Sequence, residues 1–194
     1  PPRIAPIQVI IIPVAQHKAG VLEANRAVMD RLKAAGIRVK MDDSDQSAGW
    51  KFAEYEMKGI PLRLELGPKD IEKNQCVLVR RDSGEKTFVS LDGIEATVAS
   101  MLDSIHDGLY AKAKKNLEDN TYACSSLEEV REKMQERGGF AKTMWCGDEA
   151  CEIRMKEEAG VTSRCIPFAQ EHLGDVCPVC GKPAKHMVYW GVAY

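Results

Sequence analysis

Four cysteines in two closely spaced pairs are the residues of this chain best suited to binding a metal ion. Cys146 and Cys151 bracket four residues, Cys177 and Cys180 bracket two, and 25 residues separate the pairs. Tetrahedral zinc takes four thiolates at about 2.3 Å, and two pairs of this kind can supply them. The alternative is four unrelated thiols. Because four cysteines complete the coordination sphere, we expect a structural rather than a catalytic zinc ion.

The overall composition is that of an ordinary globular protein. The chain has 194 residues, of which 44% are hydrophobic and 29% charged, and its formal net charge is −2. A nearly neutral chain argues against indiscriminate duplex binding, which depends on many phosphate contacts, but not against selective contacts to a few bases. No apolar run approaches the roughly 20 residues that span a bilayer, so we expect no membrane association.

The remaining cysteines indicate a reducing compartment. Seven cysteines fit four ligands and three free thiols, which are Cys76, Cys124 and Cys165. Paired cysteines at metal spacing, with an odd number in total, favour metal binding over disulfides. We therefore expect a cytoplasmic protein, and we expect Cys165 to be a buried free thiol.

The first part of the sequence is typical of an α/β domain. A β-branched run at 7–14 indicates a strand buried on both faces, and helical periodicity over 18–35 precedes a strand at 37–41, which completes a βαβ unit. The elements expected next are a short helix at 50–58, strands at 62–66, 76–81 and 86–91, and a long helix at 93–117. We predict a mixed five-stranded sheet flanked by helices, with the last two strands paired as a hairpin.

The second part of the sequence should form a small α+β zinc-binding domain. We place the first domain at 1–118, a linker at 119–126 and the second domain at 127–194. Ser126 is positioned to cap a helix over 127–137, with Glu129 at the capping-box position. Few large apolar residues follow, so we expect the fold of this domain to need zinc.

Separated motifs of the chain resemble a single enzyme family. The opening PPRIAPIQVIIIP and the stretch GWKFAEYEMKGIPLRLELGPKD at 49–70 resemble the anticodon-binding domain of prolyl-tRNA synthetases, in the form found in archaea, eukaryotes and some bacteria. That family has a C-terminal zinc-binding domain, which CGDEAC, TSRCIPF and CPVCG resemble. Tyr194 matches its terminal tyrosine. The resemblance covers the whole chain.

The resemblance implies the C-terminal part of a synthetase whose class II catalytic domain lies upstream. That enzyme joins proline to tRNA(Pro) using ATP and Mg²⁺. The chain opens on Pro1-Pro2 without Met, and it has no counterpart of the class II signatures, an Arg and Glu on a strand and a Gly-rich stretch ending in Glu-Arg. We therefore expect no catalytic residues, tRNA(Pro) and the N-terminal catalytic domain as partners, and a homodimeric full-length enzyme. The Tyr194 carboxylate would reach towards the active site.

The chemistry of guanine, together with the resemblance, points to four anticodon-reading residues. Proline anticodons end in two guanines. A carboxylate can accept from N1–H and N2–H₂ of guanine, while Arg or Lys can donate to O6 or N7. By resemblance, Phe52 would stack on a base, and Glu56, Arg63 and Lys69 would read the guanines. Phe52 and Glu56 share a helical face, and Lys69 lies in the loop beyond the next strand.

Each candidate also has an ordinary structural explanation. Phe52 could be a core residue, and Glu56 could pair with Lys58 or Arg63. Arg63 and Glu65 alternate with leucines, as in any half-solvated strand. Glu65 and Lys58 are weaker candidates, the first as support for Arg63 and the second as a contact to the RNA backbone.

Two other classes of function fit parts of the sequence. One is a free-standing anticodon-binding-like protein that acts as an RNA-binding or regulatory subunit without catalysis. The other is a small-molecule or redox enzyme. The turn after the first strand, AQHKAG at 15–20, has neither a GxGxxG nor a Walker pattern, and the CPVCG motif is accompanied by a second pair at zinc spacing. Both observations argue against a small-molecule or redox enzyme.

Overall fold

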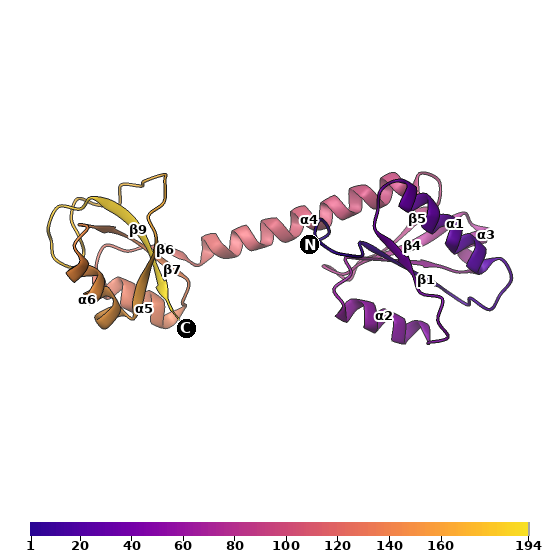
Figure 1. Cartoon of the computed structure of the whole chain (residues 1–194), viewed down its shortest axis with the longest axis horizontal. Helices are drawn as coiled ribbons and strands as arrows, with labels where there is room; N and C mark the ends of the chain where they lie inside the picture. Colours follow the sequence, from indigo (N-terminus) through magenta and orange to yellow (C-terminus); the bar gives the residue numbers. More distant parts are fainter. Residues whose placement is uncertain (194) are drawn as a thin grey trace. The chain divides into compact units, whose positions relative to one another are not determined.

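The first part of the protein is built around one mixed sheet. The computed structural model describes residues 1–193, which form two units, Pro1–Ala111 and a second that begins at Lys112 (Figure 1). The elements that begin in the first unit are β1 (Val9–Pro13), α1 (Val21–Ala34), β2 (Val39–Met41), α2 (Ala48–Met57), β3 (Leu62–Leu66), α3 (Pro68–Glu72), β4 (Gln75–Arg80), β5 (Lys86–Ser90) and α4 (Ile94–Asp119). The expected role of the Tyr194 carboxylate lies outside the described residues.

Strand order and direction confirm the predicted α/β class. The order is β2-β1-β3-β4-β5, in which β1 is parallel to β2 and β3, and β4 is antiparallel to both of its neighbours. All five residues of β1 are buried, as its β-branched sequence predicts for a central strand covered on both faces. β4 and β5 form the predicted hairpin.

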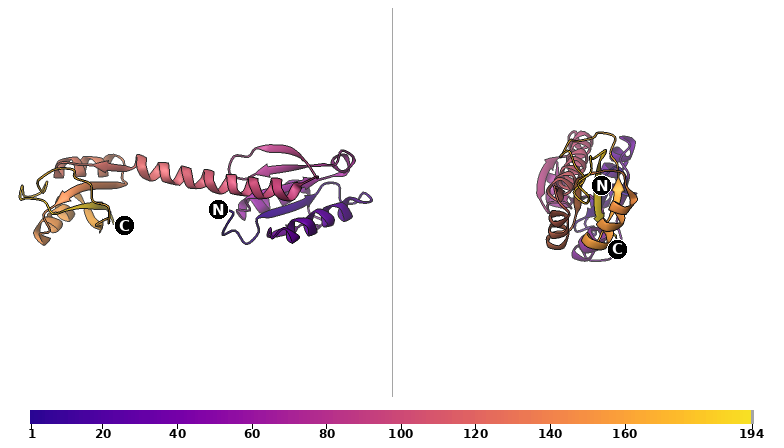
Figure 2. Two further views of the ribbon diagram at one scale, coloured as in Figure 1. Left: turned by 90° about the horizontal axis from the view of Figure 1, so that it is seen from above. Right: turned by 90° about the vertical axis from the view of Figure 1, so that its left-hand side faces the viewer.

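Helices cover the two faces of this sheet unequally. α1 and α4 pack on one face, where their apolar side chains meet the leucines of β3 in the main core (Figure 1, Figure 2). On the other face, α2 supplies Tyr55 to a smaller core with Ile10 and Ile12 of β1. The parallel register sets Ile10 opposite Arg63 and Ile12 opposite Glu65. Arg63 and Glu65 therefore lie on the face that carries α2.

A short helix that the periodicity does not reveal follows β3. α3 starts at Pro68, whose fixed φ suits the first helical position. The N–H of Gly67 donates to the Asp70 carboxylate at 3.1 Å and closes the turn. Five residues are too few to show an apolar period, so this segment reads as a loop in the sequence.

The second unit has a sheet and a core of its own. Its elements are β6 (Thr121–Ala123), α5 (Leu127–Glu136), β7 (Phe140–Trp145), α6 (Glu149–Ala159), β8 (Val161–Cys165) and β9 (His186–Val192). The strand order is β6-β7-β9-β8. α5 and α6 bury their apolar residues against Val188 and Trp190 of β9. The Oγ of Ser126 accepts from the Glu129 N–H at 3.1 Å, so Ser126 caps α5 as predicted.

Two expectations for this part of the chain were wrong. Residues 119–126 are not only a linker, because Thr121–Ala123 form a strand that pairs in parallel with β7. This pairing is long-range, and the local sequence does not indicate it. Cys165 is exposed rather than buried, because it ends β8 at the edge of the sheet. Cys76 and Cys124 are buried. Among residues 1–193, no helix combines the length and the apolar character needed to cross a bilayer.

Candidate functional site

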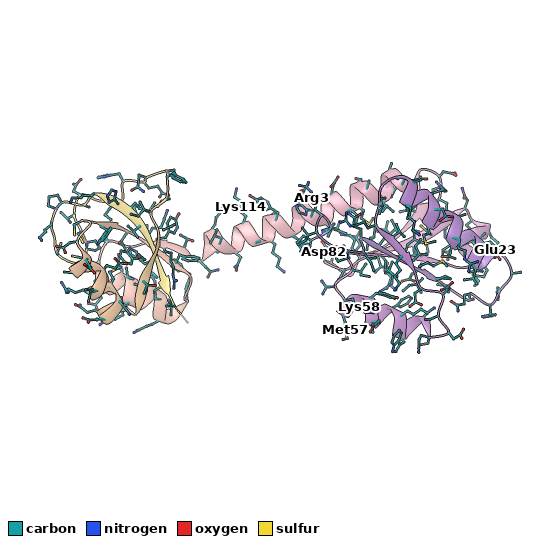
Figure 3. All side chains as sticks on the ribbon, in the orientation of Figure 1. Arg3, Glu23, Met57, Lys58, Asp82 and Lys114 are labelled. Carbon is teal, nitrogen blue, oxygen red and sulfur yellow. The ribbon has the colours of Figure 1, made fainter. Side chains whose placement is uncertain are left out.

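α2 is the element that positions the first two candidate residues. It begins after Ser47, whose Oγ accepts from the Trp50 N–H at 3.3 Å. It ends before Gly59, whose φ of +76° is the left-handed conformation that glycine tolerates best. Phe52 is half-buried against the smaller core, whereas Glu56 is exposed one turn further along the helix. Figure 3 marks Met57 and Lys58 at the same end of α2.

A buried ion pair fixes α2 to the ends of β1 and β2. The side chain of Lys51 is 2% exposed, and its Nζ donates to Gln16 Oε1 at 3.1 Å and to the Asp42 carbonyl at 3.0 Å. Burial would raise the pKa of Asp42. Hydrogen bonds from Ser44 and Tyr55 and the charge of Lys51 outweigh burial and lower it. Burial and the Asp42 partner raise the pKa of Tyr55 to about 12.

Phe52, Arg63 and Glu65 form a stacked and hydrogen-bonded group. The guanidinium carbon of Arg63 lies 4.0 Å from the centre of the Phe52 ring. The Nε of Arg63 donates to Glu65 Oε1 at 2.8 Å. Both charged side chains are 14% exposed, so this pair is well shielded from water. In the described part of the chain, no hydrogen bond engages the two terminal guanidinium nitrogens of Arg63, and they remain free to donate to a ligand.

The Glu56 carboxylate is free of the pairings that the sequence left open. Lys58 pairs with Glu54, and Arg63 pairs with Glu65. Within residues 1–193 the Glu56 carboxylate takes part in no ion pair or hydrogen bond. Its backbone carbonyl accepts from Arg81 Nε at 2.8 Å and from the Gly59 N–H at 3.1 Å. An unpaired carboxylate beside a planar cation can accept hydrogen bonds from a ligand that carries both donors and acceptors.

Two further cations, Arg81 and Lys86, lie on the α2 side of the sheet with these residues, whereas the guanidinium of Arg80 donates to Ser104 of α4 at 3.1 Å on the opposite side. A cavity of about 200 Å³ is lined by Glu56 and Arg63 together with Arg80, Arg81 and Lys86 of the β4–β5 hairpin. Arg80 donates to both carboxylate oxygens of Asp82, at 3.0 and 2.8 Å. This hydrogen bonding raises the pKa of Arg80 and lowers that of Asp82.

Sequence reasoning missed Arg81 and Lys86 because they reach the site through antiparallel pairing. The register sets Leu62 opposite Arg80 and Arg63 opposite Val79. The two adjacent arginines before a Ser-Gly turn were the available signal in the sequence. Following the predicted hairpin register back onto the third strand would have brought Arg81 and Lys86 to the face of Arg63, with Arg80 on the opposite face.

Lys69 stands apart from the other three candidates. It is exposed in α3, beyond the C-terminal end of β3. It does not line the cavity that Glu56 and Arg63 share. The structure therefore brings Phe52, Glu56 and Arg63 together and leaves Lys69 at the far end of the same strand.

The four paired cysteines converge in the second unit. Their sulfur atoms all lie within 4.8 Å of one another. The Cys146 sulfur is 3.7 Å from that of Cys151 and 3.7 Å from that of Cys180. A tetrahedron with metal–sulfur bonds of about 2.3 Å has edges of about 3.8 Å. The spacing of the sulfurs therefore fits four thiolates around a single metal ion.

The thiols of this cluster have unequal acidities. Burial raises the pKa of Cys146 and of Cys151, whereas a backbone N–H of Lys182 lowers that of Cys180 to about 7. A bound divalent cation would favour the thiolate at every position. His172 lies outside the cluster and pairs with Asp175 at 3.2 Å.

Two family models match the two units of the chain. Residues 8–101 match the model described as an anticodon binding domain, and residues 127–194 match the model described as prolyl-tRNA synthetase, C-terminal. The unit that carries Phe52, Glu56 and Arg63 therefore contains an anticodon-binding domain. The cysteine cluster lies in a C-terminal domain of the synthetase type.

Full-length comparisons agree with the family models. A proline--tRNA ligase from Clostridium botulinum (strain Okra / Type B1) is 59% identical over 194 residues, and a proline--tRNA ligase 2 from Bacillus thuringiensis subsp. konkukian (strain 97-27) is 56% identical over the same length. Each comparison covers 100% of this chain and 40% of the relative. The chain belongs to the prolyl-tRNA synthetase family. It spans about two fifths of the length of the curated relatives that it matches.

Proposed function

We propose that the first unit reads the two guanines of the proline anticodon. The observation that supports this most strongly is the unpaired Glu56 carboxylate beside the free guanidinium edge of Arg63, at a cavity ringed by further cations. Guanine offers two donors and one acceptor on its Watson–Crick edge. A carboxylate and an arginine that line one cavity match that pattern.

The stacking surface in this proposal is the Phe52–Arg63 pair rather than an isolated ring. The guanidinium carbon lies 4.0 Å from the ring centre, and a guanidinium is itself a planar group on which RNA bases stack. Glu65 keeps the guanidinium in place through its hydrogen bond. Lys69 would contact the RNA from the far end of β3, and Lys58 would contact its backbone.

We propose Zn²⁺ as the ion of the cysteine cluster, in a structural role. Four sulfur ligands at tetrahedral spacing favour zinc over the hard cations, which prefer oxygen. Four protein ligands leave no open position for catalysis. The ion would supply cross-linking that ties α6 to the loop before β9.

The complete enzyme would be a cytoplasmic proline--tRNA ligase. Its relatives are about two and a half times longer, which leaves room for the ATP- and Mg²⁺-dependent domain expected from the resemblance. In this proposal the catalytic domain is the intramolecular partner of the present chain. The same domain would form most of the homodimer contact.

A binding titration with anticodon stem-loops tests the recognition step. The chain should bind a stem-loop with a UGG anticodon more tightly than variants in which either guanine is adenine, at physiological salt. Each lost base contact should weaken binding by about 1–3 kcal/mol. Equal affinities that depend strongly on salt would contradict the proposal, because they would indicate contacts to phosphates alone.

A further inference from the structure

One large aromatic side chain lies exposed on the sheet face that carries the candidate anticodon site. Phe88 lies in the middle of β5, and it is 67% exposed. Single exposed apolar residues are common and need no special explanation. The position of Phe88 within the sheet is what connects it with the candidate anticodon site.

The register places Phe88 in line with the proposed anticodon-reading residues. Glu65 of β3 pairs with Val77 of β4, and Val77 pairs with Phe88 of β5. Directly paired residues share a face of the sheet. Phe88 therefore lies on the same face as Glu65, two strands away, which is about 10 Å at the usual strand spacing.

A parallel row of the same face carries positive charge. Arg63 pairs with Val79, and Val79 pairs with Lys86. In the described part of the chain the Lys86 ammonium takes part in no ion pair. The two rows lie side by side across β3, β4 and β5 and form one strip of the sheet face. One row ends in Lys86 and the other in the exposed ring of Phe88.

This strip continues beyond the part of the sheet that α2 covers. α2 packs over β1, where Tyr55 meets Ile10 and Ile12. Val79 is buried beneath the side chains around it, while Phe88 and Lys86 are open to solvent. The exposed ring is thus a continuation of the proposed site rather than a separate surface.

We propose that Phe88 is a stacking platform for a base of the anticodon loop other than the two guanines. This inference rests on the proposed function. Unstacked RNA bases bind on aromatic side chains of sheets with cations close by. Stacked nucleotides advance by about 3.4 Å each, so 10 Å corresponds to roughly three steps along the strand. The cations favour a nucleic acid over an uncharged protein surface as the occupant.

The test compares two aromatic residues of equal exposure. Phe88 is 67% exposed, and Tyr110 of α4 is 66% exposed in the same unit but on the helix that covers the opposite face. Phe88→Ala, Phe88→Trp and Tyr110→Ala would each be titrated with the UGG stem-loop. Phe88→Ala should raise the Kd by roughly 5- to 100-fold, which is the usual loss of affinity for one stacked base. Phe88→Trp and Tyr110→Ala should bind like the wild type.

Abasic substitutions identify the base. Stem-loops that lack one base at a time would be titrated with the wild type and with Phe88→Ala. One abasic position outside the guanines should weaken wild-type binding and leave Phe88→Ala unaffected. If the wild type prefers UGG and Phe88→Ala binds with an unchanged Kd, the stacking role of Phe88 is overturned and the proposed function is not. Loss of UGG preference in the wild type itself would overturn the proposed function, and the inference with it.

Discussion

The guanidinium carbon of Arg63 lies 4.0 Å from the centre of the Phe52 ring, while its Nε donates to Glu65 at 2.8 Å. These two contacts hold the guanidinium over the ring, and within the described residues its terminal nitrogens make no hydrogen bond. A lysine at this position would keep the positive charge but lose the plane, the stacking and the forked donors. The contribution of Arg63 to binding is therefore geometric as well as electrostatic.

Arg63→Lys should impair RNA binding almost as much as Arg63→Ala. We expect both variants to weaken binding to the UGG stem-loop by about 1–3 kcal/mol. Circular dichroism would check that the fold is preserved, because either substitution disturbs the pair with Glu65, whose side chains are only 14% exposed. Titrations at two salt concentrations measure the effect, and Arg26→Lys is a control because Arg26 pairs with Asp43 at an exposed site of the same unit. Wild-type affinity in Arg63→Lys would show that only the charge of this residue matters.

Cys177→Ser should destabilise the second unit selectively. Loss of one of four ligands should lower its free energy of unfolding by about 3 kcal/mol, roughly a quarter of the apparent binding energy of a structural zinc ion. Trp145 packs against the cysteine cluster, and its ring centroid is 6.4 Å from that of Trp190. In a Trp50→Phe background, tryptophan fluorescence therefore reports this unit.

Chelation of the metal should reproduce the effect of Cys177→Ser. Cys165→Ser is the matched control, because Cys165 is exposed and lies outside the cluster. Far-ultraviolet circular dichroism should show that the first unit stays folded in all cases. A simultaneous loss of both units would mean that the two do not fold independently. A fluorescence change on reduction but not on chelation would exclude the metal.

Asp42→Asn should cost stability in a pH-dependent way. The substitution leaves the buried Lys51 ammonium, 3.8 Å from Asp42 Oδ1, without its counter-charge, at a cost of about 3 kcal/mol at neutral pH. The pKa of Asp42 is lowered in the folded protein, so the unfolded chain binds its proton more tightly. The contribution is present above about pH 4 and is lost as the pH falls towards the folded-state pKa.

Urea unfolding of wild type and variant across the acid range measures this loss. The difference between the two should shrink below about pH 4. Asp43→Asn provides a neighbouring control, since the Asp43 carboxylate pairs with Arg26 at 3.5 Å at an exposed site, and its cost should be below about 0.5 kcal/mol. A difference that is constant with pH would show that the charge of Asp42 is not what stabilises the site.

Gly139→Ala should destabilise the second unit more than Gly138→Ala. Gly138 and Gly139 have φ angles of +68° and +87°, so alanine is strained at both by about 1 kcal/mol. Only at Gly139 would the new Cβ lie 2.3 Å from the carbonyl oxygen of Asn120, which accepts from Phe140 at 2.8 Å. We expect a further loss of about 2 kcal/mol there. Thermal melts of the two variants compare the costs, and equal melting temperatures would contradict this account.

Local signals in the sequence were sufficient for much of the fold. The β-branched run predicted the buried central strand, and alternation with leucines predicted β3, because both patterns depend only on neighbouring residues. Ser126 and Glu129 marked the start of α5 for the same reason. Cysteine spacing predicted the cluster, since a turn of two to four residues brings paired thiols together.

Features set by long-range pairing were not visible in the sequence. β6 forms only because β7 offers it a parallel partner. Arg81 and Lys86 reach the candidate site through the register of the β4–β5 hairpin. The free state of the Glu56 carboxylate depends on the choice of Glu54 by Lys58 and of Glu65 by Arg63. From the sequence alone, Glu56 was a possible partner of both Lys58 and Arg63.

A double-mutant cycle between Glu56 and the anticodon guanines tests the central claim most directly. Inosine lacks the N2 amine of guanine, so replacing each guanine by inosine removes one donor that the Glu56 carboxylate should accept. Wild type and Glu56→Ala would be titrated with the UGG stem-loop and with both inosine variants. At one position the inosine penalty should disappear in Glu56→Ala, with a coupling of about 1 kcal/mol or more. Fully additive effects at both positions would contradict the account, because Glu56 would then accept from the N2 amine of neither guanine.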